Sequence, residues 1–321
     1  MAEMYTYQVA RVRARELGLL SRQDIDQLMA AKTYGECVRV LNDKGWGTGT
    51  EKNAEEIFAA EDNKLWDFIR ELVSDLSPFN VLLYPADYNN LKAAIKLAAT
   101  GAEPHNVFKS GGTVPPEEML EAVHNNSFGG LPEKMAEAAE KAYKTLLQTR
   151  DGQLCDIILD KACLEEIYAA GRASKDSLIK EYADLSVAIS NIKIAVRCCK
   201  TGKSLSFIKE SLVDCGSLNA DSLAHAASKS LEDVYSYLSA TEYAEAADKL
   251  KESSSAFEKW CDDKMMELIK GQKMNPFTIG PIMAFIIARR NEINTVRIIL
   301  SGKLNLIDDG IIRERLRDMY V

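Results

Sequence analysis

Three twelve-residue segments of this 321-residue chain align without a gap, and their first residues lie 101 and 100 positions apart. They are "NLKAAIKLAATG" from Asn90, "NIKIAVRCCKTG" from Asn191 and "NEINTVRIILSG" from Asn291. Each has Asn first, a β-branched residue sixth, a basic residue seventh, a hydroxyl eleventh and Gly twelfth. Ordinary helical solenoids repeat about every 33 to 47 residues. The longer period predicts three similar units, each larger than one solenoid repeat.

Apolar residues recur every three or four positions along most of the chain, and no stretch alternates as a half-buried strand does. This pattern predicts an all-α protein. Segments rich in Gly, Pro and Asn are expected to break the helices at 42–50, 76–87, 110–116, 125–132 and 273–277. Helices are expected over 24–41, 53–75, 87–100, 116–123, 132–170 with a break near Asp151, 176–201, 219–238, 241–271, 277–301 and 308–319.

A long helix precedes each copy of the repeat, so each unit is expected to be a helical hairpin with a smaller helix appended. Three such units, over 1–102, 103–203 and 204–321, suggest a pseudo-threefold arrangement. Units placed around a common axis would enclose a central hollow.

The stretch "RCCKTGKS", residues 197–204, ends like a phosphate-binding loop, whose pattern is G-x-x-x-x-G-K-[ST]. Arg197 occupies the place of the first Gly, and a helical pattern precedes the stretch where that loop needs a strand. We therefore predict no nucleotide site. Gly202 is expected to end a helix in the left-handed conformation, as are Gly101, Gly302 and Gly18 of a weaker N-terminal copy.

The composition narrows the classes of partner. A net charge of −8 works against binding a nucleic-acid backbone. Seven cysteines without a C-x-x-C pair indicate reduced thiols, and the N-terminus does not resemble a secretory signal. The longest uncharged stretch, 274–288, is shorter than the roughly 20 apolar residues that span a bilayer, so 279–288 is expected to be a buried core helix.

Several segments together resemble the C subunit of the bacterial and archaeal V-type (A-type) ATPases, which is similar to the d subunit of the eukaryotic vacuolar enzyme. They are "YTYQVARVRARELGLLS" at 5–21, the three Asn-to-Gly segments, and "ARRNEINTVRIILSGKLNLIDDGIIRERLRDMY" at 288–320. The resemblance covers essentially the whole chain. It implies a non-catalytic, funnel-shaped protein of three helical units.

In that family the protein lies on the cytoplasmic face of the membrane rotor ring, receives the foot of the central shaft, and passes torque between ATP hydrolysis or synthesis and ion translocation. The expected partners are therefore the shaft and ring subunits, with the isolated chain a monomer that needs no cofactor. Whether H⁺ or Na⁺ is coupled, and in which direction the machine runs, stays open. The alternative hypothesis is a free-standing helical scaffold for cytosolic partners.

Basic residues recur at one position of the repeat and crowd the N-terminal copy. The candidates for partner contact are Arg11, Arg13, Arg15, Lys96, Arg197, Arg289, Arg290 and Arg297. Under one hypothesis they face an acidic partner, which suits the planar, five-donor head of Arg. Under the other they are hydrated, or they pair with carboxylates of neighbouring helices. His105, His124 and His225 lack ligands at zinc spacing, so no metal site is predicted.

Overall fold

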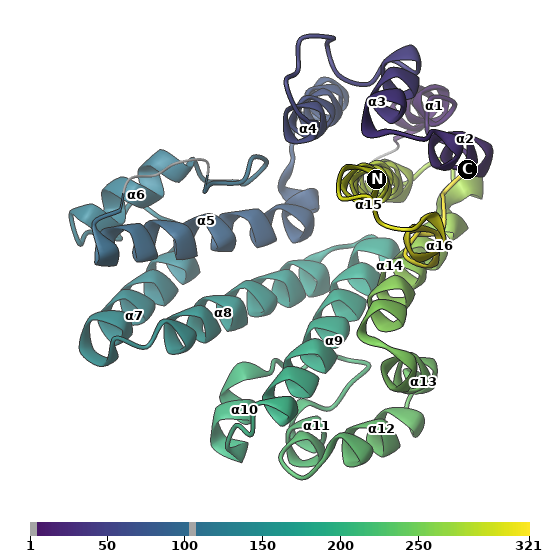
Figure 1. Ribbon diagram of the computed structural model, residues 1–321. Coiled ribbons are helices and arrows are strands. Elements are labelled where there is room, and N and C mark those ends of the chain that lie inside the picture. The colour runs from purple at the N-terminus through teal and green to yellow at the C-terminus, as the bar shows by residue number, and fades with distance from the viewer. Residues whose placement is uncertain (1–4, 103–106) are drawn as a thin grey trace. The chain divides into compact units, whose positions relative to one another are not determined.

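Helices make up all the regular secondary structure in residues 5–102 and 107–321, which are the residues that this computed structural model describes (Figure 1). The prediction of an all-α fold is confirmed. None of the described helices is both long and apolar enough to cross a membrane.

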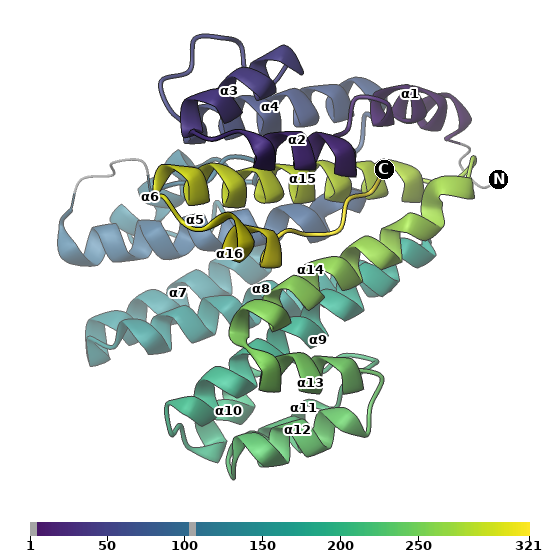
Figure 2. The same ribbon diagram turned by 45° about the vertical axis from the view of Figure 1, so that its right-hand side comes forward.

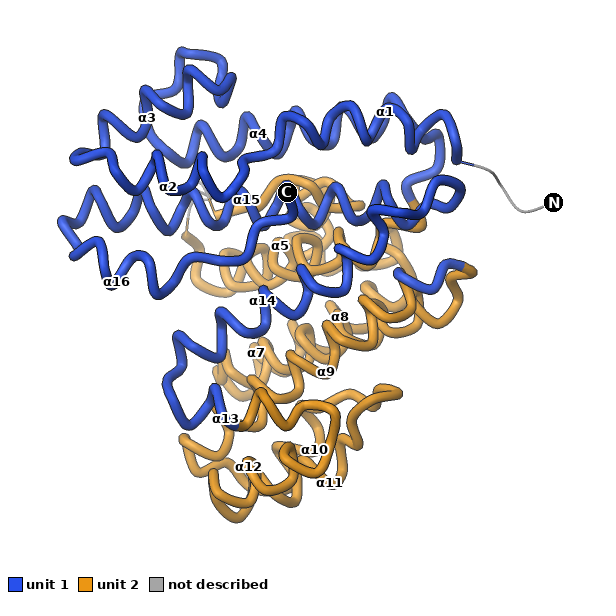
Figure 3. Tube along the Cα trace, turned by 90° about the vertical axis from the view of Figure 1, so that its right-hand side faces the viewer, with its two compact units in different colours: residues 1–76, 176–178, 248–321 blue, residues 77–175, 179–247 orange. Residues whose placement is uncertain are grey.

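The helices group into two units, which Figure 3 colours separately. Unit 1 takes its described residues from 1–76, 176–178 and 248–321, and unit 2 from 77–175 and 179–247. Unit 1 contains α1 (Thr6–Glu16), α2 (Arg22–Ala30), α3 (Tyr34–Asp43), α4 (Ala54–Leu72), α14 (Ser254–Lys270), the 3-10 turn η2 (Gly271–Met274), α15 (Gly280–Leu304) and α16 (Asp309–Glu314).

Unit 2 contains the 3-10 turn η1 (Ser77–Phe79), α5 (Asn80–Thr100), α6 (Pro116–His124), α7 (Glu133–Thr149), α8 (Gly152–Ala173), α10 (Leu205–Ser211), α11 (Ala220–Ala227) and α12 (Leu231–Ser239). From Ile179 on, α9 (Ser177–Lys200) also belongs to unit 2, and α13 (Ala244–Glu252) changes unit after Ala247. The predicted division into three repeats is not the same as these two units and stays a prediction.

In unit 1, α15 is the helix around which the others pack. It contacts α1, α2, α3, α4, α14 and α16, and Figure 2 shows α1 to α4 along one side of it. Every residue from Gly280 to Ala288 is buried, which confirms that the apolar stretch 279–288 belongs to the core. A helix that is apolar on all sides needs such a position.

In unit 2, α8 packs against α5, α7 and α10, and α5 also packs against α6. The close approach of α8 and α9 depends on Gly171, because a Cβ built there would lie 2.2 Å from the Cβ of Ala183. The break predicted near Asp151 is confirmed: α8 begins at Gly152, and the Asp151 carboxylate accepts hydrogen bonds from the Gln153 and Leu154 amides.

Several predicted boundaries were wrong. The predicted break over 76–87 is largely helical, since α5 begins at Asn80 and continues through Pro85. Pro85 removes one backbone donor, but the buried side chains of Val81, Leu82 and Leu83 hold this turn against the core. The predicted helices over 24–41, 219–238 and 241–271 are each two helices.

The left-handed caps predicted for the first two copies of the repeat are confirmed at Gly101 (φ +66°) and Gly202 (φ +63°). After α9, the amide of Lys203 donates to the Cys198 carbonyl and that of Gly202 to the Cys199 carbonyl. This is the Schellman pattern, which satisfies two carbonyls at the helix end.

The predictions for Gly302 and Gly18 were wrong, because neither has a positive φ. Gly302 lies inside α15, which runs on to Leu304, and Leu306 takes the left-handed position at φ +54°. A Cβ on Gly302 would lie 2.5 Å from Cδ1 of Ile312, so this glycine allows α16 to approach α15. The third copy thus keeps its glycine for packing and ends its helix about one turn later.

The asparagine that opens each copy has a structural role that the sequence did not reveal. Asn90 and Asn191 are almost fully buried, and each side chain makes two hydrogen bonds with one downstream backbone residue. Asn90 Nδ2 donates to the Lys109 carbonyl (2.9 Å), and its Oδ1 accepts from the Lys109 amide (2.7 Å). Asn191 binds the Val213 carbonyl (2.6 Å) and amide (3.1 Å) in the same way.

In the third copy, Asn291 Nδ2 donates to the carbonyl of Asp318 (2.9 Å) in the C-terminal segment. This segment also forms an ion pair between Arg317 and Asp262 (2.6 Å). Each repeat asparagine therefore fixes the chain that follows its own helix, 19, 22 or 27 residues downstream.

Candidate functional site

Two of the three repeat cations form ion pairs with a neighbouring helix. Lys96 of α5 lies 2.7 Å from Asp156 of α8. Arg297 of α15 lies 3.1 Å from Glu55 of α4, with its guanidinium 4.6 Å from the centre of the Phe58 ring. Both pairs are partly exposed, so each contributes roughly 0 to 1 kcal/mol to stability.

The two acidic partners are separated by the same number of residues as the first two repeat segments. Glu55 and Asp156 are 101 residues apart, as are Asn90 and Asn191. Adding the second spacing of 100 residues leads to Ala256, which has no charge. The same spacing thus finds a carboxylate at two positions and alanine at the third, a signal that was present in the sequence but was overlooked.

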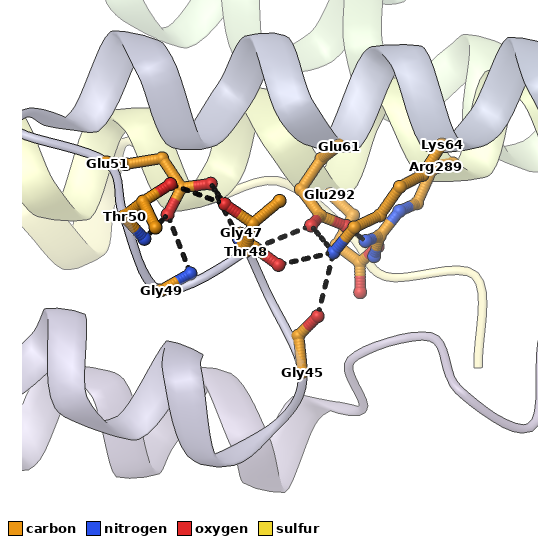
Figure 4. Close-up of polar contacts among 10 residues, drawn as sticks. All are labelled: Gly45, Gly47, Thr48, Gly49, Thr50, Glu51, Glu61, Lys64, Arg289 and Glu292. Atoms are coloured by element: carbon orange, nitrogen blue, oxygen red, sulfur yellow. Dashed lines mark hydrogen bonds and ion pairs between the residues drawn. The ribbon is translucent and has the colours of Figure 1, made fainter.

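Arg289 lies at the centre of a buried charged cluster in unit 1 (Figure 4). Its guanidinium binds the carboxylates of Glu61 and Glu292, both almost fully buried, and lies 4.5 Å from the centre of the Trp46 ring. Burial raises the pKa of Glu292, although Arg289 favours its charged form. Lys64 also binds Glu61 (2.8 Å). Removing one member of such a cluster leaves a buried charge uncompensated, so Arg289 is used inside the fold.

The other predicted arginines of unit 1 also contact neighbouring helices. Arg290 of α15 lies 3.8 Å from Asp62 of α4, and its guanidinium is 5.2 Å from the centre of the Trp66 ring. Arg11 of α1 pairs with Glu71 of α4 (3.1 Å).

Near the same helix, Arg13 binds Glu16 (2.7 Å) and donates to the Gln272 carbonyl (2.7 Å). Arg15 is exposed and lies 4.9 Å from the centre of the Phe68 ring. These contacts agree with internal pairing, the second hypothesis for the candidate cations. Whether any of these arginines also meets a partner stays a prediction.

Arg197 differs from the other repeat cations. It is exposed, and none of the ion pairs in the described part of the chain includes it. Its side chain lines a groove of about 300 Å³ in unit 2, where α5, α8 and α9 meet. The helices line the groove with residues spaced three or four apart, so that one face of each is turned toward it.

The groove combines an apolar floor with positive charge. Val81, Leu164, Ile167 and Ile194 supply apolar surface. The charged lining residues are Lys92, Lys193, Arg197 and Asp160, three positive and one negative. This local excess of two positive charges contrasts with the net charge of −8 of the whole chain.

Polar side chains give the groove hydrogen-bonding capacity. Lys92 Nζ lies 2.5 Å from Asp160, which neutralises one of the three cations. The Ser186 hydroxyl is buried and has no hydrogen-bond partner among the described residues. Tyr88 donates to Glu166 (2.9 Å), whose pKa is raised mainly by burial. Arg197 thus leaves donors available at a surface that the fold itself does not fill.

The four residues Thr-Gly-Lys-Ser are accounted for by local structure. Lys203 Nζ donates to the Gln153 side chain (2.9 Å) and lies 4.8 Å from the centre of the Phe207 ring. The Ser204 hydroxyl accepts from the Phe207 amide and caps α10. The amides needed to wrap a phosphate are therefore used at the end of one helix and the start of the next.

Thiols and histidines offer no second site within the described ranges. All seven cysteines are free, and burial raises the pKa of Cys155 to about 11 and that of Cys163 to about 12, which opposes thiolate formation. No group of three His, Cys, Asp or Glu side chains in the described ranges is placed to hold a metal ion. His105 lies outside the described residues.

Comparison with known proteins gives one consistent family. The family model described as ATP synthase (C/AC39) subunit matches residues 8–315. The C subunit of the V-type sodium ATPase of Enterococcus hirae is 22% identical over 96% of this chain and 97% of its own length. The C subunit of the A-type ATP synthase of Pyrococcus horikoshii is 26% identical over 98% and 90%, and that of Methanocaldococcus jannaschii is 25% identical over 97% and 86%. Because the family model matches nearly the whole chain, this protein belongs to the ATP synthase (C/AC39) subunit family.

Proposed function

We propose that this protein is a non-catalytic central-stalk adaptor of a rotary ATPase, which links the central shaft to the membrane rotor ring and transmits torque between them. The observation that carries the proposal is the family match over residues 8–315, together with relatives named as C subunits that align over nearly their full length. In this role the protein lies at the cytoplasmic face of the membrane, held there by the ring.

The packing within each unit supports a mechanical role. A part that transmits torque must deform little under load, and fixed contacts between distant segments oppose deformation. Charged pairs join α5 to α8 in unit 2 and α15 to α4 in unit 1. The buried asparagines add hydrogen bonds between each repeat helix and the chain that follows it.

The repeat also supports three units around a central hollow as part of the proposal. The equivalent acids Glu55 and Asp156 bind the equivalent cations Arg297 and Lys96. Lys96 lies in the first predicted unit and its acid, Asp156, in the second. Arg297 lies in the third predicted unit and its acid, Glu55, in the first. That order is expected of a closed ring of three repeats.

Co-purification from the native organism tests the proposal. A tagged chain should bring down the shaft and ring subunits, with about one copy of the tagged chain per complex. A chain tagged at the same end but carrying Arg289→Glu, which disrupts the buried cluster, controls for capture by misfolded protein. Recovery of unrelated cytosolic proteins without ATPase subunits would favour the scaffold alternative and contradict the proposal.

A further inference from the structure

We propose that the groove lined by α5, α8 and α9 of unit 2 is a docking site for an acidic segment of a partner protein. One apolar side chain of the segment lies on the floor, and a neighbouring carboxylate binds Arg197. The inference rests on the proposed function, since the partner it names belongs to the same ATPase. It goes beyond that function because it assigns the surface that binds the partner and the acidic character of the segment that is bound.

The dimensions of the groove determine what can enter it. About 300 Å³ is at the lower end of the range for ligand sites, roughly 300 to 1,000 Å³. A helix is about 10 Å across and cannot enter, but a helix lying across the opening can insert one or two side chains. The floor formed by Leu164, Ile167 and Ile194 fits an apolar side chain, which would supply binding energy through burial.

The charges of the groove select an acidic partner. Its lining has three cations and one carboxylate, in a chain whose overall charge is negative. Arg197 is exposed at the groove and offers a planar fork of donors that matches a carboxylate. A nucleic-acid backbone is disfavoured by the net charge and by the apolar floor, so an acidic protein segment agrees best with both features.

The repeat explains why Arg197 is free for this purpose. The equivalent cations Lys96 and Arg297 bind Asp156 and Glu55. Continuing the spacing that separates Glu55 from Asp156 leads to Ala256, which has no charge. Lys96 and Arg297 are thus neutralised by acids of the same chain, and Arg197 is not. We therefore expect Arg197 to bind a carboxylate of another protein.

A charge reversal with a matched control tests the proposal. Arg197→Glu should weaken binding to the ATPase subcomplex that lacks this protein by about tenfold or more, since it replaces an attractive pair with a repulsive one. Lys200→Glu is the control, because it changes the charge of the same helix by the same amount. Lys200 is exposed and does not line the groove, so the Lys200→Glu variant should bind the subcomplex within about twofold of wild type. Biolayer interferometry at two salt concentrations measures both, and wild-type binding should weaken with salt.

Crosslinking provides a second measurement that does not depend on the reversal. A photoreactive benzoylphenylalanine at Ser190, which lines the groove, should capture a shaft or ring protein of the ATPase. The captured peptide should contain Asp or Glu within one helical turn of the crosslinked residue. The same probe at Lys200 should not capture that peptide.

The outcomes separate this inference from the proposed function. If wild type binds the subcomplex and Arg197→Glu binds as well as Lys200→Glu, the groove assignment is wrong while the adaptor role stands. If wild type does not bind the subcomplex, the adaptor role itself fails. Crosslinks from Ser190 to this same chain, or to lipid, would also overturn the groove assignment.

Discussion

Replacing Asn191 by Ala is the most direct test of the part that the repeat asparagine plays in the fold. The Asn191 side chain is completely buried and holds both backbone groups of Val213, at 2.6 Å and 3.1 Å. Alanine keeps the helix intact, because it is the residue with the highest helix propensity. The perturbation is therefore limited to the clamp between α9 and the segment after α10.

The size of the effect follows from the two lost hydrogen bonds. A buried donor or acceptor left without a partner costs roughly 1 to 3 kcal/mol, and Val213 would have one of each. Water that enters the vacated space recovers part of this loss. We expect the variant to lose about 3 kcal/mol of stability, which corresponds to more than a hundredfold change in a local opening equilibrium.

Hydrogen exchange measures this change at the place where it occurs. Peptides covering 212–216 should lose protection in Asn191→Ala, and the circular dichroism midpoint in urea should fall. The three tryptophans, Trp46, Trp66 and Trp260, all belong to unit 1, so their fluorescence provides a reference for that unit. Asn89→Ala, which removes a partly exposed asparagine of α5, is the control and should change stability by about 0.5 kcal/mol or less.

The reasoning is refuted if the 212–216 peptides exchange at the same rate in Asn191→Ala and in Asn89→Ala. It is also refuted if protection is lost equally across unit 1, because the clamp would then not be local.

Three further predictions test other parts of the fold. Gly202→Ala should cost about 1 kcal/mol in urea denaturation, whereas Gly271→Ala, at a right-handed glycine with open space around it, should not destabilise; equal midpoints would contradict the cap. Hydrogen bonds from the Thr48 hydroxyl and amide lower the Glu51 pKa from 4.5 to about 2, so the stability it adds is present above pH 4.5 and is lost as the pH falls toward 2. Thr48→Val should raise that pKa in a carboxyl ¹³C NMR titration, and an unchanged value would show that the hydroxyl does not matter. Calorimetry should detect no saturable binding of Mg-ATP, and micromolar binding abolished by Lys203→Ala would restore the nucleotide hypothesis.

Local sequence rules predicted the helices well and their ends less well. Periodicity found most of the long helices because each buries one face, and the break before α8 followed from Asp151 and Gly152. The same rules failed at Pro85, where burial of neighbouring side chains outweighs a local breaker. They failed again at Gly302, where glycine is needed because α16 packs too closely for a Cβ atom.

The candidate site was harder to predict, because its chemistry depends on contacts between distant residues. Whether a cation faces a partner or a neighbouring helix depends on its acid, and Glu55 lies 242 residues from Arg297. Periodicity within one helix carries no such information. The spacing of the repeat does carry it, since it connects Glu55 to Asp156 and then to Ala256.

That spacing also yields a test of whether the two ion pairs are equivalent. Lys96 with Asp156 and Arg297 with Glu55 each lie within one unit, so each pair can be measured by its own double-mutant cycle. Lys96→Gln with Asp156→Asn, and Arg297→Gln with Glu55→Gln, should each give a coupling energy of about 0.2 to 1 kcal/mol, the range of exposed pairs, and it should decrease with salt. A coupling energy of zero in one cycle but not in the other would contradict the equivalence and leave the two ion pairs as separate features of the two units.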